Sequence, residues 1–208
     1  MITVVLAIVA YLIGSVCFAV IMSHMFRLPD PRAYGSGNPG AINVLRSGNK
    51  VVAIITLLGD ALKGWLAVWL AGCVAQRFAA AGDAELAVAI AGTLSVIGHM
   101  YPVFHRLQGG KGVATALGVL FGFNVYLGLG GISMWIIVAM LFHMSSLASI
   151  VAALFALFAT WMLFSVTHPF FASVVLLAIL VIYRHRQNIK NILAGTERKF
   201  GQIVKPCV

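Results

Sequence analysis

Long apolar runs, separated by short polar segments, dominate the sequence. The runs cover approximately residues 2–26, 51–74, 86–104, 113–142, 147–164 and 170–182. Each run is continuous rather than alternating at every second position, which favours membrane-spanning helices over the strands of a barrel. Of the 208 residues, 62% are hydrophobic and only 9% are charged, too few charges to cover a soluble domain. The pattern therefore predicts an all-α integral membrane protein.

The run 113–142 decides the number of spans. As one helix it would extend about 45 Å, against a hydrocarbon core of about 30 Å, and Gly128, Gly130 and Gly131 offer a turn within it. If it forms two short spans, Arg77 is the only one of the 14 Lys and Arg residues on the outer side. A single span would place the basic tail outside, against the preference of basic residues for the cytoplasm.

We therefore expect a single membrane domain over residues 1–208 with seven transmembrane helices, the N-terminus outside and the C-terminus in the cytoplasm. The first run lacks a basic start and is longer than the apolar part of a cleavable signal, so we expect it to remain as the first span. The net charge of +9 is attributed to cytoplasmic loops that meet anionic lipid and anionic substrates, and no nucleic-acid partner is expected.

This topology places three polar segments on the cytoplasmic face, at 34–46, 98–115 and 183–201. Glycines in the first segment allow positive φ and let backbone N–H groups converge on an anion. Its candidate ligands are Gly35, Ser36, Gly37, Asn38, Gly40, Asn43 and Arg46. A flexible loop between helices is the alternative. The string also matches G-x-G-x-x-G, but a membrane span precedes it instead of a strand, so we reject a dinucleotide site.

The second segment contains Gly109, Gly110 and Lys111 directly before an apolar run. Free N–H groups, the positive end of a helix and an ammonium group together are typical of a phosphate site. The segment is not a Walker A loop, because Gly112 stands where that loop has Ser or Thr. A glycine turn with a lysine at the membrane surface is the alternative interpretation.

The third segment begins at Tyr183 and contains Arg184 and His185. If the last span continues as a helix, Arg184, Asn188 and Asn191 share one face, with His185 at its edge. An imidazole there could act as an acid or a base near neutral pH. The alternative is a basic anchor for anionic lipid.

Span two contains Asp60 and Lys63, three residues apart and therefore on one helix face. A charged group within a bilayer costs about 2.5–3.5 kcal/mol on insertion scales, so we expect an internal ion pair that supports the polar loops. Ser146 is expected to cap the helix of span six or to contact a ligand. The three cysteines lack metal spacing and acidic residues are scarce, so no metal or other cofactor is predicted.

Together these segments resemble the three motifs of the bacterial acyl-phosphate:glycerol-3-phosphate acyltransferases, the PlsY family. The matching strings are Gly-Ser-Gly-Asn-Pro-Gly-Ala-Ile-Asn-Val-Leu-Arg (35–46), Gly-His-Met-Tyr-Pro-Val-Phe (98–104) with Gly-Gly-Lys-Gly-Val-Ala-Thr (109–115), and Arg-His-x-x-Asn-Ile with Gly-x-Glu-x-Lys (184–189 and 195–199). Asp60-x-x-Lys63-Gly64 and Ser145-Ser146-Leu147 also fit. The chain departs from the pattern at Ile42, where threonine is usual, and at Gln108, where lysine is usual.

The resemblance implies transfer of an acyl group from acyl phosphate to the 1-hydroxyl of sn-glycerol 3-phosphate. The products would be lysophosphatidic acid and phosphate, in the first acylation step of phospholipid synthesis, at the cytoplasmic face of the bacterial inner membrane. None of the six histidines has Asp five residues on, so the His-x-x-x-x-Asp class of glycerolipid acyltransferases is excluded. The oligomeric state is left open, with a monomer plausible. The rival interpretation is a transporter of a small phosphorylated solute, although the chain shows no repeated halves.

The expected roles follow from the two phosphate groups of the substrates. The donor phosphate is assigned to both glycine loops (35–40 and 109–110) with Lys111, and glycerol 3-phosphate to Arg46 with Asn188 and Ser146. Ser36 and His185 are expected to orient the attacking hydroxyl, while Asp60, Lys63 and Glu197 support the site. Either His185 or a substrate phosphate could take the hydroxyl proton.

Overall fold

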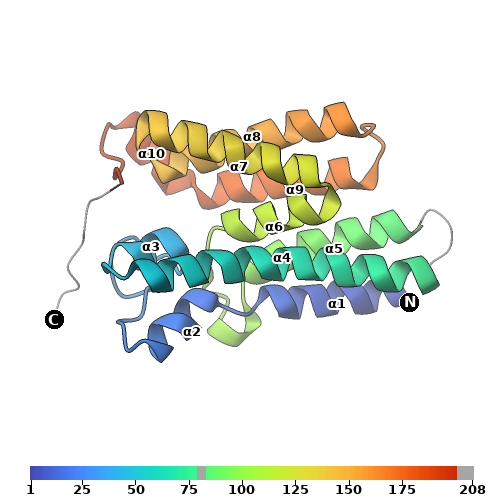
Figure 1. Ribbon diagram of the computed structural model, residues 1–208, viewed down its shortest axis with the longest axis horizontal. Coiled ribbons are helices and arrows are strands. Elements are labelled where there is room, and N and C mark those ends of the chain that lie inside the picture. The colour runs from blue at the N-terminus through green and yellow to red at the C-terminus, as the bar shows by residue number, and fades with distance from the viewer. Residues whose placement is uncertain (79–82, 201–208) are drawn as a thin grey trace.

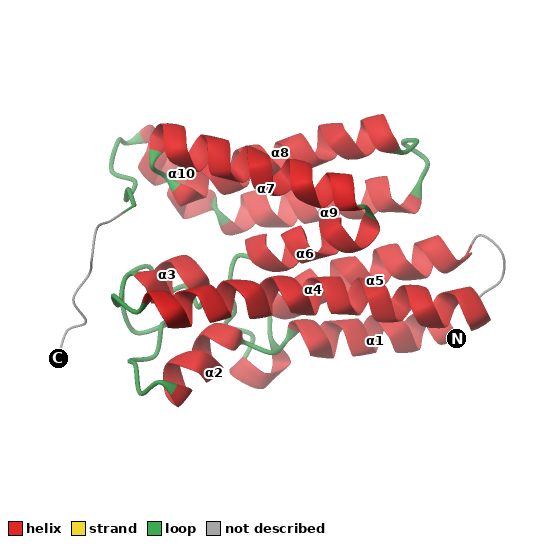
Figure 2. Ribbon diagram, in the orientation of Figure 1, coloured by secondary structure: helices red, strands yellow, loops and turns green. Residues whose placement is uncertain are grey.

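The computed structural model describes residues 1–78 and 83–200, and all regular elements in these two ranges are helical (Figure 2). The elements are α1 (Ile2–Gly14), α2 (Phe18–Met25), α3 (Ala41–Leu45), α4 (Lys50–Phe78), α5 (Asp83–Met100), the 3-10 turn η1 (Val103–His105), α6 (Val113–Phe123), α7 (Val125–Phe142), α8 (Ser145–Leu163), α9 (Pro169–Arg184) and α10 (Arg186–Leu193). Within these two ranges, five stretches are long and apolar enough to cross a membrane, and the bent pair α9–α10 would make a sixth. The predicted all-helical membrane fold is confirmed.

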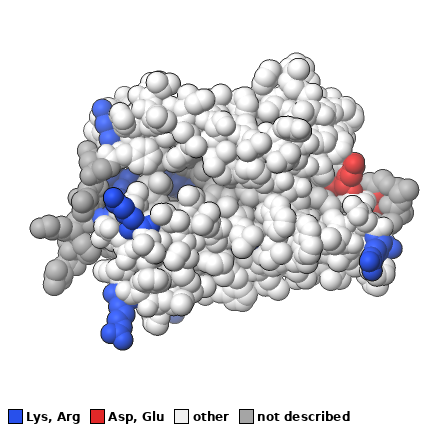
Figure 3. All heavy atoms as spheres, in the orientation of Figure 1, with Lys and Arg blue, Asp and Glu red and all other residues white. Residues whose placement is uncertain are grey.

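The long helices run in alternating directions, so the connections gather at two ends of the bundle (Figure 1). One end, called here the polar end, holds α2, α3, η1 and α10 together with the segments 26–49, 101–112 and 185–200. Basic side chains gather over this end, and the visible acidic atoms lie at the opposite end (Figure 3). The opposite end includes Arg77 in the last turn of α4 and Asp83 and Glu85 in the first turn of α5.

The run 113–142 forms two helices, as predicted, but it breaks at Asn124 and not at the glycines. Asn124 is extended, with φ −162° and ψ 133°, and its side chain accepts a hydrogen bond from Tyr126 N at 2.8 Å. This contact caps the start of α7. Gly128 and Gly131 instead lie buried within α7, where a side chain added at Gly128 would overlap the Phe121 ring. The glycines therefore permit close packing between α6 and α7.

The first apolar run is also interrupted, because α1 ends at Gly14 and α2 begins at Phe18. The break frees the carbonyl of Val16, which accepts a hydrogen bond from Lys63 Nζ at 2.6 Å. Lys63 Nζ also lies 2.9 Å from Asp60 Oδ1, and both side chains are only 3% exposed. The predicted internal ion pair is confirmed. The Lys63 ammonium thus pairs both with the Asp60 carboxylate and with the Val16 carbonyl, which would otherwise be unpaired inside the bundle.

Glycines bring the helices of the bundle close together. Side chains added at Gly64 of α4 or Gly118 of α6 would overlap backbone atoms of the other helix. Gly14 of α1 and Gly98 of α5 meet the facing backbone in the same way. Small residues at such crossings let membrane helices pack by van der Waals contact, because lipid provides no hydrophobic driving force between them. This packing fixes the ends of α1, α4, α5 and α6, which carry the polar segments.

Candidate active site at the polar end

The loop before α3 is organised around the side chain of Asn43, which is only 1% exposed. Its Nδ2 donates to the carbonyls of Pro31 at 2.6 Å and Tyr34 at 3.1 Å, and its Oδ1 accepts from Ser36 N at 3.0 Å. Both amide hydrogens are therefore used within the loop. Asn43 was predicted to bind substrate, but in this geometry it holds the loop from inside.

Two of the predicted glycines have the backbone conformation that the loop needs. Gly35 has φ +62° and Gly37 has φ +66°, in the left-handed region that favours glycine. The Ser36 side chain between them is exposed. Asn38 and Gly40 complete the turn, with Gly40 N donating to Asn38 O at 2.9 Å. The loop thus presents the Ser36 hydroxyl to the outside of the polar end.

Arg46 follows the last residue of α3 and is half-buried. Its guanidinium makes no hydrogen bond or ion pair with the rest of the described chain. Burial lowers the pKa of Arg46, and the nearby Arg198 charge lowers it further, while Glu197 acts in the opposite direction. A half-buried guanidinium without a protein partner is suited to bind an anion.

The glycine–lysine segment is held by Arg184, which the sequence places in the third polar segment without predicting a role for it. Arg184 Nη2 donates to Gly109 O at 2.7 Å and Nε donates to Gly110 O at 3.1 Å. The guanidinium also lies over the Tyr101 ring, 5.4 Å from its centroid. Gly110 N donates to His99 O at 3.0 Å. The expectation that the glycine N–H groups are free for phosphate is therefore wrong for Gly110.

Lys111 projects from this segment into a continuous chain of hydrogen bonds. Lys111 Nζ donates to Asn188 Oδ1 at 2.6 Å, and Asn188 Nδ2 donates to Glu197 Oε1 at 2.7 Å. Ser146 Oγ donates to the same Glu197 oxygen at 2.7 Å. The chain joins four predicted residues from three distant parts of the sequence. Ser146 was also considered as a helix cap, but α8 begins at Ser145 with Met144 at the N-cap position, and it has no side-chain cap.

The segment after α10 folds back over the start of α8, which explains why Glu197 reaches Ser146. Thr196 N donates to Asn191 O at 2.8 Å, and Phe200 N donates to His143 O at 2.8 Å. The Phe200 ring meets Trp135 edge to face, with centroids 6.2 Å apart. The segment is therefore fixed on both sides of Glu197.

His185 lies just beyond α9, where the chain bends by 58° into α10. The predicted continuous helical face of Arg184, Asn188 and Asn191 is therefore interrupted. His185 is 2% exposed, and its Nδ1 lies 2.8 Å from Val181 O. A carbonyl only accepts, so Nδ1 carries the hydrogen and Nε2 of the neutral ring is an acceptor. Burial, with the nearby Lys111 charge, lowers the pKa of His185 to about 4.

Positive charge exceeds negative charge in this cluster. Burial lowers the pKa of Lys111 from 10.5 to about 8, and the surrounding charges come from Glu197, Arg46 and Arg184. Arg198 is close enough to act on Arg46. Among the described residues, one carboxylate thus faces several cations. A cluster of this kind is suited to ligands that bring their own negative charge, such as phosphate groups.

The structure brings together Arg46, Lys111, His185, Asn188, Ser146 and Glu197, whose charges or hydrogen bonds act on one another. Ser36 shares the polar end, but no hydrogen bond joins its hydroxyl to this cluster within residues 1–78 and 83–200. Over the same residues, no group of three or more His, Cys, Asp or Glu side chains could hold a metal ion. The role of Arg184 in holding the glycine carbonyls was missed, although its place in the third polar segment beside His185 was the available signal.

Comparisons with known proteins agree over almost the whole chain. The model of the family described as "Glycerol-3-phosphate acyltransferase" matches residues 4–195. A glycerol-3-phosphate acyltransferase of Ralstonia nicotianae is 52% identical over 204 residues, covering 98% of this chain and 97% of the relative. A protein of the same name from Burkholderia pseudomallei is 54% identical over 194 residues, covering 93% of each chain.

Two solved structures share the fold. The crystal structure of PlsY, an integral membrane glycerol 3-phosphate acyltransferase, in its glycerol 3-phosphate form has a TM-score of 0.87 and 35% identity, with 97% of this chain and 96% of that chain covered. The lysophosphatidic acid form has a TM-score of 0.85 and 34% identity, with 97% of both chains covered.

Proposed function

Because this chain belongs to the glycerol-3-phosphate acyltransferase family, we propose that it transfers an acyl group from acyl phosphate to the 1-hydroxyl of sn-glycerol 3-phosphate. The products are lysophosphatidic acid and inorganic phosphate. The observation that carries the proposal is the cation-rich cluster around Lys111 and Arg46 at one end of an apolar helical bundle. Two phosphate groups and a lipid chain can meet there.

In the proposed step the 1-hydroxyl oxygen attacks the carbonyl carbon of acyl phosphate. A carbon–oxygen ester bond forms, the carbon–oxygen bond to phosphate breaks, and phosphate leaves with the electron pair. Cations next to the leaving phosphate stabilise the charge that develops on it. No covalent intermediate on Ser36 is proposed, because no base is paired with its hydroxyl in the described chain.

The residues divide between the two substrates. Lys111, on the backbone segment that Arg184 holds, binds the phosphate of the acyl donor. Arg46 binds glycerol 3-phosphate, because its guanidinium is half-buried and has no partner within residues 1–78 and 83–200. Asn188 and Ser146 are connected through Glu197, and Asn188 accepts from Lys111. These contacts hold Lys111 at a fixed distance from the bound glycerol 3-phosphate.

His185 and Ser36 orient the attacking hydroxyl. With Nδ1 donating to Val181 O, the neutral His185 ring offers Nε2 as an acceptor for the hydroxyl proton. A pKa of about 4 makes the imidazole a weak base in the free enzyme. A substrate phosphate, which loses its second proton near pH 6, is therefore the stronger base of the two that the sequence analysis left open.

The topology proposed for the chain has seven crossings in one membrane domain, counting the short α6. The polar end faces the cytoplasm of the bacterial inner membrane, in keeping with the enrichment of basic residues on that side. Single cysteines at Gln108 and Arg77, in a chain without the native cysteines, test this orientation in intact cells. An impermeant thiol reagent should label the cysteine at position 77 and leave the one at position 108 unlabelled; the reverse pattern rejects the orientation.

The reaction is tested with purified protein in detergent, radiolabelled glycerol 3-phosphate and a long-chain acyl phosphate. We expect labelled lysophosphatidic acid and an equal amount of phosphate. Turnover with acyl-CoA but not with acyl phosphate would reject the proposed donor. Detergent removes the second compartment that a transporter needs, so the absence of turnover, together with glycerol 3-phosphate exchange in vesicles, would favour the rival function.

A further inference from the structure

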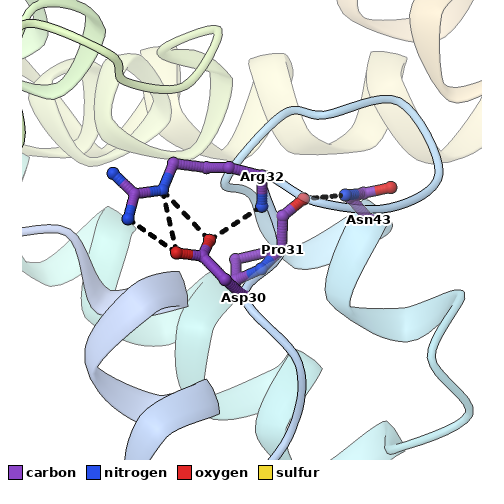
Figure 4. A network of polar contacts seen from close by, with 4 residues as sticks. All are labelled: Asp30, Pro31, Arg32 and Asn43. Atoms are coloured by element: carbon purple, nitrogen blue, oxygen red, sulfur yellow. Dashed lines mark hydrogen bonds and ion pairs between the residues drawn. The ribbon is translucent and has the colours of Figure 1, made fainter. Parts of the chain in front are cut away.

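Two charged residues just before the glycine loop take no part in the proposed chemistry. Asp30 and Arg32 lie two residues apart, and the Asp30 carboxylate accepts hydrogen bonds from both the backbone and the side chain of Arg32 (Figure 4). Arg32 N lies 2.9 Å from Oδ1, Nε lies 3.0 and 3.1 Å from the two oxygens, and Nη2 lies 2.6 Å from Oδ2. These contacts fix the short turn between the two residues.

The pair is too exposed to stabilise the fold strongly. The side chains of Arg32 and Asp30 are 31% and 40% exposed, and exposed ion pairs generally contribute little to stability. The hydrogen bonds between Asp30 and Arg32 instead fix the direction of the backbone from residue 30 to residue 32. Between the two residues lies Pro31, which is buried and whose ring fixes φ. With both neighbours tied together, the Pro31 carbonyl is directed at the side chain of Asn43 (Figure 4).

Asn43 connects this carbonyl to Ser36. Its Nδ2 donates to Pro31 O at 2.6 Å, and its Oδ1 accepts from Ser36 N at 3.0 Å. Because Asn43 is 1% exposed, losing either partner would leave part of a buried amide unpaired, which is unfavourable. Asn43 Nδ2 also donates to Tyr34 O at 3.1 Å, so the amide is held between two carbonyls. A shift of Pro31 disturbs this arrangement and, through Oδ1, the backbone of Ser36. The hydroxyl of Ser36 has no other partner in the described chain to hold it.

We propose that Asp30 and Arg32 are positioning residues for Ser36, acting through Pro31 and Asn43. Neither residue touches substrate in this account. They determine where the loop places the Ser36 hydroxyl relative to the attacking hydroxyl of glycerol 3-phosphate. The inference rests on the proposed function, because it requires Ser36 to act in acyl transfer. Loss of the pair should therefore lower kcat and leave KM for glycerol 3-phosphate nearly unchanged.

A double-mutant cycle tests the connection, with Asp30→Ala and Ser36→Ala made singly and together and kcat measured in detergent. The Asp30→Ala variant should lose about tenfold in kcat, the equivalent of one hydrogen bond, with KM within about twofold of wild type. In the Ser36→Ala background the same change should have no further effect, because residues that act through one another are not additive. An equal loss in both backgrounds would overturn the inference.

Two further variants separate backbone positioning from charge. Asp30→Asn keeps an acceptor for Arg32 N and should retain at least about half of the wild-type kcat. Exchanging the charges, Asp30→Arg with Arg32→Asp, keeps an ion pair but removes the backbone contact, so it should not restore activity. Restoration by the exchange would show that charge alone matters and would reject the positioning role. Where Asp30→Ala elutes as an aggregate, Arg32→Lys, which loses the forked contact, replaces it in the cycle.

The matched control is Glu85→Ala, which removes an exposed carboxylate at the opposite end of the bundle, where Glu85 Oε2 lies 3.1 Å from His168 Nε2. Its kcat should equal that of wild type. If Ser36→Ala keeps wild-type kcat, the positioning role fails while acyl transfer by the chain stands. If wild-type protein makes no lysophosphatidic acid from any acyl donor, the proposed function itself fails, so the two failures are distinguishable.

Discussion

The charge of Lys111 should limit activity at alkaline pH. Burial lowers the pKa of Lys111 to about 8, from 10.5 for an ordinary lysine. The ammonium is therefore lost as the pH rises through about 8 in the free enzyme. At pH 9 about one tenth of the molecules keep the charge, so kcat/KM for acyl phosphate should be about tenfold below its plateau. An unperturbed lysine would remain almost fully charged at that pH.

The assay is a pH profile of lysophosphatidic acid formation between pH 6 and pH 10, corrected for spontaneous hydrolysis of acyl phosphate. A bound phosphate favours the ammonium form, so the alkaline limb of kcat should lie at higher pH than the limb of kcat/KM. In Lys111→Arg the alkaline limb should disappear, because a guanidinium stays charged throughout this range. Only the shape of the pH profile of Lys111→Arg is compared with that of wild type. Its absolute rate can differ for another reason, because an arginine side chain has a different shape from a lysine side chain.

Lys199→Arg is the control for this prediction. Lys199 lies outside the hydrogen-bonded chain from Lys111 to Ser146, so its replacement should leave the limb near pH 8 unchanged. A limb that persists in Lys111→Arg would refute the reasoning, because another group would then be responsible. The absence of any limb below pH 10 in the wild-type enzyme would show that Lys111 is not desolvated as the structure indicates.

The other predictions concern single substitutions. Arg46→Met should lower kcat/KM for glycerol 3-phosphate about tenfold to a hundredfold through loss of a charged hydrogen bond, while Lys199→Met changes it little; equal effects in purified, folded protein would contradict the assignment. His185→Gln should keep an acid limb near pH 6 if the substrate phosphate takes the proton, and the limb should follow the pKa of a phosphonate analogue; a limb lost with the histidine would identify His185 as the base. Gly110→Ala should lower the thermal unfolding midpoint in detergent, because the added methyl group overlaps the His99 ring; an unchanged midpoint would show that the segment can move away.

The helical fold was predictable because apolar run length is a direct consequence of bilayer thickness. The Asp60–Lys63 ion pair was predictable as well, since helical spacing and the cost of buried charge both point to it. The break in the run 113–142 was located wrongly. Glycine and asparagine both permit a helix to end; here Asn124 caps the start of α7 with its side chain, while Gly128 lies within α7 against Phe121.

The site was predictable as a set of residues but not as a set of contacts. Asn43 and Arg184 both donate hydrogen bonds to backbone carbonyls. The positions of backbone carbonyls are not visible in the order of residue types, so these contacts could not be predicted from the sequence. The bend at His185 was missed because the polar residues beyond it continue a helical spacing. The partners of Glu197 also required the three-dimensional path of the tail.

The chain of hydrogen bonds from Lys111 to Ser146 has a consequence for biosynthesis. Arg46 and Lys111 emerge early from the ribosome, whereas Asn188 and Glu197 emerge only after α9 has been made. Helices enter a membrane in the order of their synthesis, and domains form as their segments become available. A nascent chain that stops before Glu197 therefore has its cations without the carboxylate that organises them. We therefore expect acyl transfer to require a chain that already contains Glu197, and chains that stop before it in the membrane to be inactive.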